Sequence, residues 1–288
     1  MKITDYTQAI ENGLTHADWH VRWDWVKKLE TPPTPEQVER GLTDEHWVVR
    51  RAWVERMDYT PTPEAIERGL SGMDAASSHI PDDTLKYVQV SWIKRMDFTP
   101  TPEQIERGLM DKEWIVRQAW VWRMDYHPTP EQVERGLLDE HSSVRQAWAQ
   151  RQDWTPTPEQ VERGLRDLDK HVRVDWVRRL DFLPAPEQIE RGLTDTHSRV
   201  REAWAGRTDW APTPEQIEMG ISDADADVVV AWLKRDDIAW STTQIQRGLQ
   251  HFSWDVRIIS EFLMRKQWER CAQNTTTESY GSTETSCI

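Results

Sequence analysis

Apolar and polar positions recur along the chain with a long period, which one short motif makes visible. The pair Gly-Leu, or Gly-Ile in one copy, begins at residues 13, 41, 69, 108, 136, 164, 192, 220 and 248. The copies are 28 residues apart except for one step of 39, so one unit carries an 11-residue insertion, within about residues 71–83. A fixed period of roughly 20 to 50 residues is the signature of a repeat architecture. We therefore predict about nine structural units.

Each unit predicts two short helices. The first begins at Thr-Pro-Glu-Gln, as in residues 157–160, where Thr is a good amino cap, Pro suits the first helical position and Gln completes a capping box. The second carries an apolar stripe at spacings of three and four, such as Val144, Ala147 and Trp148, and ends before Pro-x-Pro. Its expected amino caps are Asp44, Asp111, Asp139, Asp167, Asp195 and Asp223.

Neither helix can bury its stripe alone, so the units are expected to stack into a continuous one-dimensional core. The pattern Val-Arg-x-Ala followed by Pro-Thr-Pro-Glu-x-Ile, as at Val200, Arg201, Ala203, residues 212–215 and Ile217, resembles the leucine-rich repeat variant family, a relative of HEAT-like helical repeats. The resemblance covers roughly residues 5–265. It implies an all-α, right-handed α-solenoid (superhelix) of about nine 28-residue two-helix repeats.

The same resemblance bears on cofactors and on domain limits. An iron–sulfur cluster accompanies at least one member of the family, but the cysteine-rich segment that it needs is absent here, so no cofactor is expected. Only Cys271 and Cys287 are present, and neither a disulfide framework nor a zinc site is predicted. We expect one solenoid over residues 1–270 and a tail of disordered composition over residues 271–288.

Composition narrows the class of partner. With 36 basic and 50 acidic residues the net charge is −14, which disfavours nonspecific binding to nucleic acid or to anionic membranes. No apolar run approaches the roughly 18 residues of a membrane span, and the amino end lacks a hydrophobic signal core. The expectation is a cytoplasmic protein that does not contact a membrane.

Tryptophan repeats at one position, twelve residues past the glycine in regular units. Because this position lies on the same stripe as Val and Ala, a buried ladder is the favoured interpretation. The alternative is a stacking platform for bases or sugars. The set comprises Trp25, Trp53, Trp92, Trp120, Trp148, Trp176, Trp204 and Trp232.

Arginine also repeats, each time two residues before an aspartate. One interpretation is a ladder of forked hydrogen bonds that links neighbouring units. The other is a cationic stripe that recognises phosphates or an acidic protein. Three further tryptophans occupy positions where other units have Ser, Lys or Ala. The candidate partner-binding residues are Arg56, Arg95, Arg123, Arg151, Arg179, Arg207, Arg235, Trp47, Trp114 and Trp122.

Variation between units is a second guide to contact positions, because a structural residue must repeat and a contact residue need not. Residues four to seven past the glycine vary, and so do pairs five and six past the core valine, such as Val121-Trp122 and Ala205-Gly206. We therefore expect a binding face on the second helix. His46, His141 and His197 share one position, lie too far apart for a metal site and are expected to face solvent.

No catalytic residues are predicted, since the chain lacks a phosphate loop, a His-Glu-x-x-His motif and a nucleophile elbow. The leading hypothesis is a non-enzymatic scaffold that binds or sequesters a protein. The alternatives are a nucleic-acid-binding HEAT-like protein that uses the arginines, and an inhibitor whose acidic rows mimic nucleic acid.

Overall fold

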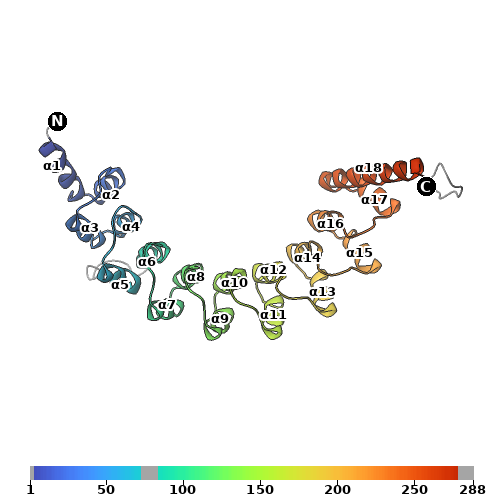
Figure 1. The fold of residues 1–288 in the computed structure, drawn as a ribbon, viewed down its shortest axis with the longest axis horizontal. Coiled ribbons are helices and arrows are strands. Elements are labelled where there is room, and N and C mark those ends of the chain that lie inside the picture. The colour runs from blue at the N-terminus through green and yellow to red at the C-terminus, as the bar shows by residue number, and fades with distance from the viewer. Residues whose placement is uncertain (1–2, 73–83, 278–288) are drawn as a thin grey trace. The chain divides into compact units, whose positions relative to one another are not determined.

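The structure is a computed structural model that describes residues 3–72 and 84–277, with side chains for residues 6–72 and 84–270. Over these residues the chain folds into 18 helices arranged as nine successive pairs (Figure 1). The all-α class and the two-helix repeat are therefore confirmed. Most of the predicted insertion and residues 278–288 lie outside the described part of the chain.

The helices form two compact units, Met1–Trp154 and Thr155–Ile288, where the sequence predicted one solenoid domain. The first unit contains α1 (Ile3–Leu14), α2 (Trp19–Lys28), α3 (Pro35–Leu42), α4 (Trp47–Val54), α5 (Pro63–Ser71), α6 (Leu85–Lys94), α7 (Pro102–Leu109), α8 (Trp114–Val121), α9 (Pro130–Leu137) and α10 (Ser142–Gln150). The second unit contains α11 (Pro158–Leu165), α12 (Lys170–Arg178), α13 (Pro186–Leu193), α14 (Ser198–Ala205), α15 (Pro214–Gly220), α16 (Ala226–Leu233), α17 (Thr242–Leu249) and α18 (Trp254–Thr277).

The last helix is longer than the sequence predicted. Helix α18 runs seven residues past residue 270, where the disordered tail was expected to begin. No Pro or Gly lies between Trp254 and Thr277, so nothing within this helix breaks it.

First helices, which carry odd numbers, begin as their sequence predicts. The Thr129 hydroxyl accepts a hydrogen bond from the backbone N–H of Gln132, and the Gln132 side-chain oxygen accepts one from the N–H of Thr129. Pro130 occupies the first helical position of α9. Each such helix is short, and this capping box satisfies backbone donors that would otherwise lack a partner.

Second helices, which carry even numbers, begin two residues later than predicted. The residue that caps α10 is His141, not Asp139. Asp139 instead accepts a hydrogen bond from the N–H of His141 at 2.8 Å and pairs with an arginine of the preceding repeat. The prediction that these aspartates are amino caps is wrong, because Asp44, Asp139, Asp195 and Asp223 each bind an arginine of the preceding repeat and Asp111 binds Gln89.

Within each unit the second helices pack side by side in one layer, and the first helices form another with far fewer contacts between its members (Figure 1). The repeated tryptophans lie between the layers, which confirms the buried ladder. Trp25, in the first repeat, is half-buried. The other seven are 1–3% exposed: Trp53, Trp92, Trp120, Trp148, Trp176, Trp204 and Trp232.

Candidate interaction surface

The repeated arginines are structural. The Nε of Arg123 donates to Asp125 at 2.9 Å and its Nη2 donates to the other carboxylate oxygen at 2.5 Å. Its Nη1 donates to the backbone oxygens of Ile93 and Arg95, both at 2.9 Å, and Nη2 also donates to that of Phe98 at 3.0 Å. A guanidinium has five N–H donors, and these contacts use all five. Arg123 therefore links its own repeat to the preceding one and has no donor left for a partner.

Aromatic rings enclose the same guanidinium groups. Arg123 lies over the ring of Phe98 at 4.7 Å, and Arg207 lies over Phe182 at the same distance, a cation–π geometry. The arginine holds the pKa of Asp125 below its usual value by hydrogen bonding, while burial raises the pKa of Tyr126 to about 12. The guanidinium is buried while its Asp125 partner stays partly exposed, and hydrogen bonding favours the ionised form of that carboxylate.

The structure thus contradicts the assignment of the repeated arginines to a partner-binding surface. Six of them are only 2–4% exposed: Arg95, Arg123, Arg151, Arg179, Arg207 and Arg235. The side chain of Arg56 is 13% exposed and pairs with Asp58. The physical reason is that carbonyl groups at the carboxyl end of each second helix need donors, and the arginine of the next repeat supplies them.

A second arginine ladder runs along the amino ends of the second helices. Arg117 donates from Nε and Nη2 to both carboxylate oxygens of Asp139 in the next repeat, at 2.6 and 2.7 Å. Its Nη1 donates to the backbone oxygens of Asp111 and Lys112. Such two-point pairs fix the distance between repeats.

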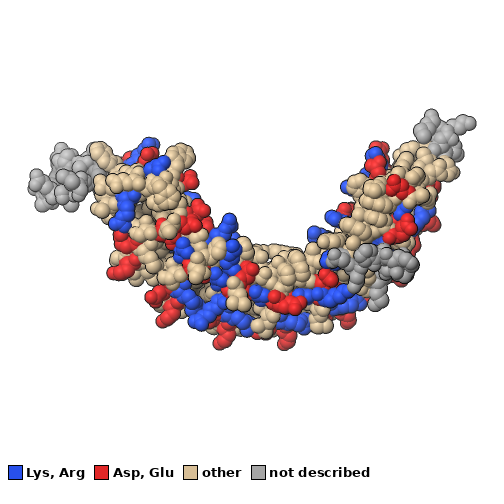
Figure 2. Space-filling model, turned by 180° about the vertical axis from the view of Figure 1, so that it is seen from behind, with Lys and Arg blue, Asp and Glu red and all other residues tan. Residues whose placement is uncertain are grey.

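The first helices are linked as well. Glu106 accepts hydrogen bonds from Gln132 and Arg135 of the following repeat, both at 2.9 Å. Accordingly, basic and acidic side chains lie side by side over the face drawn in Figure 2. The repeated charges therefore serve mainly to join repeats.

A different set of positions on the second helices lies mostly at the surface, although Val90 and Val174 at two of these positions are buried. We define the second-helix face as the residues six before, two before and two after each ladder tryptophan, counted from Ser260 in α18; residues four apart share one side of a helix. In the first unit it comprises Trp19, Trp23, Lys27, Trp47, Arg51, Glu55, Lys86, Val90, Lys94, Trp114, Gln118, Trp122, Ser142, Gln146 and Gln150. In the second unit it comprises Lys170, Val174, Arg178, Ser198, Glu202, Gly206, Ala226, Val230, Lys234, Trp254, Ile258 and Phe262.

This face agrees with the sequence prediction only in part. Of each variable pair after the core valine, the second member lies on the face, but the first is buried: Val121 and Ala205 are 0% exposed. The sequence reasoning missed the positions two before the tryptophan, such as Glu202. These positions lie four residues before the variable positions that follow each tryptophan, and this helical spacing was the signal that could have identified them.

The three candidate tryptophans all lie on the second-helix face. Trp114 and Trp122 are 37% and 48% exposed, while Trp47 is half-buried. Trp114 stacks on His141 of the next repeat, with ring centroids 4.0 Å apart. Trp122 is the most open of the three and offers an indole directly to solvent.

The histidines are less exposed than predicted. His46 stacks on Trp19 with centroids 3.9 Å apart and is half-buried, and its Nδ1 is buried with no hydrogen-bond partner. Burial lowers the pKa of His46. The expectation that this residue faces solvent is wrong, because the indole of the preceding repeat covers its ring.

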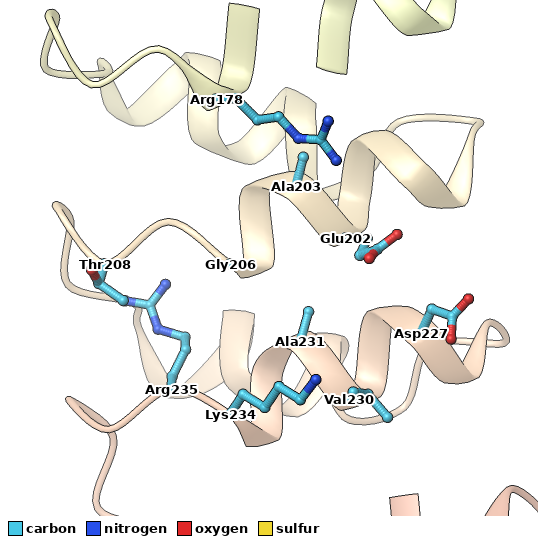
Figure 3. A pocket seen from close by; sticks show the side chains of 10 residues that line it. All are labelled: Arg178, Glu202, Ala203, Gly206, Thr208, Asp227, Val230, Ala231, Lys234 and Arg235. Carbon is cyan, nitrogen blue, oxygen red and sulfur yellow. The ribbon is translucent and has the colours of Figure 1, made fainter. Parts of the chain in front are cut away.

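An open pocket of about 410 Å³ lies on the second-helix face of the second unit, between α12, α14 and α16 (Figure 3). Its rim carries Arg178, Lys234, Glu202 and Asp227, and Gly206 lies on α14, between the helices that carry or precede the two cations.

Within residues 3–72 and 84–277, no group of His, Cys, Asp and Glu is arranged to hold a metal ion, and no helix is long and apolar enough to span a membrane.

Comparisons with known proteins agree on the architecture. The chain is similar to a solved leucine-rich repeat variant with a novel repetitive structural motif, at 21% identity and a TM-score of 0.53, over 86% of this chain and 87% of the other. Residues 187–203 match the HEAT repeat associated with sister chromatid cohesion. No curated protein sequence matches the chain. The protein has a helical-repeat solenoid fold, and the predicted resemblance is confirmed at the level of that fold.

Proposed function

We propose that this protein is a non-enzymatic scaffold that binds a protein partner through the second-helix face. The observation that supports the proposal is that different positions of the repeat have different roles, some joining the repeats and others facing solvent. The repeated arginines are used in ladders within and between repeats, whereas most positions of the second-helix face differ from one repeat to the next. A surface that varies while its frame stays constant is typical of helical repeats that recognise extended partners.

The chemistry of the face favours a protein. It presents exposed tryptophan beside small, polar and charged residues, and tryptophan is among the residues that contribute most to protein interfaces. The net charge of −14 and the burial of the repeated arginines weigh against the nucleic-acid alternative.

The test is affinity capture of the tagged full-length protein from cell lysate, with nuclease, followed by mass spectrometry. The wild type is compared with a Trp114→Ser plus Trp122→Gln variant, which takes the residues that the next repeat has at Ser142 and Gln150. A partner that the wild type retains and the variant loses supports the proposal. Recovery unchanged in this variant and in other second-helix-face variants, or bound nucleic acid with no protein, contradicts it.

The control variant is Glu131→Gln, on the exposed side of a first helix. It leaves the second-helix face intact and is expected to retain the partner.

A second candidate function rests on a different observation. The glutamate that follows the first proline of each first helix is exposed in seven repeats: Glu36, Glu64, Glu103, Glu131, Glu159, Glu187 and Glu215. A protein that uses this row to occupy a basic, nucleic-acid-binding site would lose its partner on Glu131→Gln with Glu159→Gln and retain it in the tryptophan variant.

A further inference from the structure

Gly206 stands in the pocket of the second unit without a structural reason to be glycine. Gly72 adopts a positive φ of 64°, and the repeated glycines lie directly against the residue twelve positions on in the repeat. By contrast, Gly206 has an ordinary φ of −77°. A Cβ there would meet only backbone oxygens, at 3.5 and 3.7 Å, which is normal contact. Among the described glycines it alone is required neither by backbone conformation nor by close packing.

The absent side chain is what opens the pocket. The equivalent position, two residues after the ladder tryptophan, is filled by Trp122 directly after α8 and by Phe262 in α18. On the two helices that flank α14 the same position carries Arg178 and Lys234. Gly206 therefore leaves a gap in a row of long side chains, floored by Ala203 and Ala231 (Figure 3).

The charges around the gap are separated by sign. Arg178 is exposed, and its nearest carboxylate, Asp175, is 3.8 Å away, a loose ion pair. Lys234 is also exposed. Asp227 lies in the first turn of α16, about two helical turns before Lys234, and Glu202 lies one turn before Gly206 on α14. A helical turn rises about 5.4 Å, so the cationic and anionic ends of the pocket are about 5 to 11 Å apart along the helices.

From this geometry we infer that the pocket binds a short extended segment of a protein partner, with an Asp or Glu carboxylate seated over Gly206 between Arg178 and Lys234. A Lys or Arg one to three residues away in the segment reaches Glu202 and Asp227, because extended residues advance about 3.3 Å each. Charge complementarity selects this occupant: a carboxylate satisfies both cations, and the small residues of the floor leave room for its side chain. The inference rests on the proposed function, and it specifies the chemistry of one subsite.

The experiment selects peptides from a random dodecapeptide phage library on the immobilised full-length protein. Enriched sequences are synthesised with a fluorescent label and titrated by fluorescence polarisation. We expect them to carry Asp or Glu with Lys or Arg one to three positions away. Replacing that acid by its amide is expected to weaken binding at least tenfold.

Two variants locate the site. Gly206→Trp fills the gap with the residue that another repeat has there, and Arg178→Gln plus Lys234→Gln removes the cations without altering the floor. Each is expected to weaken binding at least tenfold. The matched control, Gln152→Trp, places the same large residue at an exposed position of the first unit outside the second-helix face and is expected to shift affinity less than twofold. Circular dichroism and the urea midpoint check that each variant is folded.

The outcomes separate the two proposals. Peptides that bind Gly206→Trp as well as the wild type, or that need no acidic residue, overturn the inference. If those peptides lose binding to the Trp114→Ser plus Trp122→Gln variant, the proposed function is retained and the subsite assignment fails. If the library yields no specific binder, the inference fails, while affinity capture still tests the proposed function independently.

Discussion

Gly136 packs directly against the indole of Trp148 in the same repeat. The indole of Trp148 lies so close to the backbone of Gly136 that a Cβ on residue 136 would overlap its Nε1. The same relation recurs between the glycine that ends a first helix and the tryptophan of the second helix in each of the eight repeats that have both residues. The Gly-Leu motif is therefore the place where two helices of one repeat approach closely enough to bury a tryptophan.

This contact predicts that Gly136→Ala destabilises the protein. The added methyl group must displace a buried indole, and overpacking of this kind costs about 1–3 kcal/mol. Urea unfolding followed by circular dichroism measures the loss. Because repeat arrays need not unfold in two states, the midpoint and the slope are both compared.

The control for that variant is Gly206→Ala, where the methyl group enters open space and φ is compatible with alanine. We expect it to be neutral or to stabilise by up to about 1 kcal/mol, because it restricts the unfolded chain. Equal losses in the two variants would show that the indole contact does not explain the glycine.

A second prediction concerns Arg123. Removing a buried, fully hydrogen-bonded charge leaves Asp125 and three backbone oxygens unpaired, so Arg123→Met is expected to cost about 3–5 kcal/mol. Arg123→Lys also destabilises, because an ammonium lacks the forked geometry. The exposed Arg135→Ala is the comparison and should cost no more than about 1 kcal/mol. Thermal denaturation compares the stabilities of these three variants with that of the wild type. Wild-type stability in Arg123→Met would contradict a stabilising role for Arg123.

Acid should weaken the same ladder. Arg123 lowers the pKa of Asp125 in the folded protein, so the ionised form favours folding. That contribution is complete above the unfolded pKa of about 3.9 and is lost as the pH falls through the folded pKa. We expect the stability difference between wild type and Asp125→Asn to shrink as the pH is lowered from 5 to about 2.5 in urea titrations. A constant difference over this range would exclude the ionised carboxylate as its cause.

His46 predicts a separate pH dependence. Burial beside Trp19 lowers its pKa below the usual value of about 6.5, so the folded protein favours the neutral ring. The associated stability is present above about pH 6.5 and is lost as the pH falls through the folded pKa. Proton NMR titration reports the pKa directly. His46→Phe keeps an aromatic ring in the stack and should remove this part of the pH dependence; an ordinary NMR pKa for His46 would disprove the prediction.

Sequence alone identified the units, both helices of each and the buried tryptophans, because capping boxes and stripes at spacings of three and four are local patterns. One of its two alternatives, an arginine ladder between repeats, is confirmed, but Arg123 forms its forked bond within its own repeat and reaches the neighbour through backbone oxygens. It misplaced the amino caps of the second helices, since Asp139 is equally suited to cap a helix and to bind the Arg117 of another repeat. The preference of Asp for amino-cap positions does not distinguish between these two roles.

What the sequence determined is therefore the repeat, and what the tertiary structure decided is which side of each repeat its neighbours cover. The 28-residue period shows that Arg123 and Arg207 are equivalent, but it does not show which way their side chains point. Only the packed structure shows that these guanidiniums point into the preceding repeat while Trp122, Arg178 and Lys234 remain open. The reason is physical: helical periodicity depends on residues that are close in sequence, whereas the burial of these arginines depends on hydrogen bonds to residues 25 or more positions away.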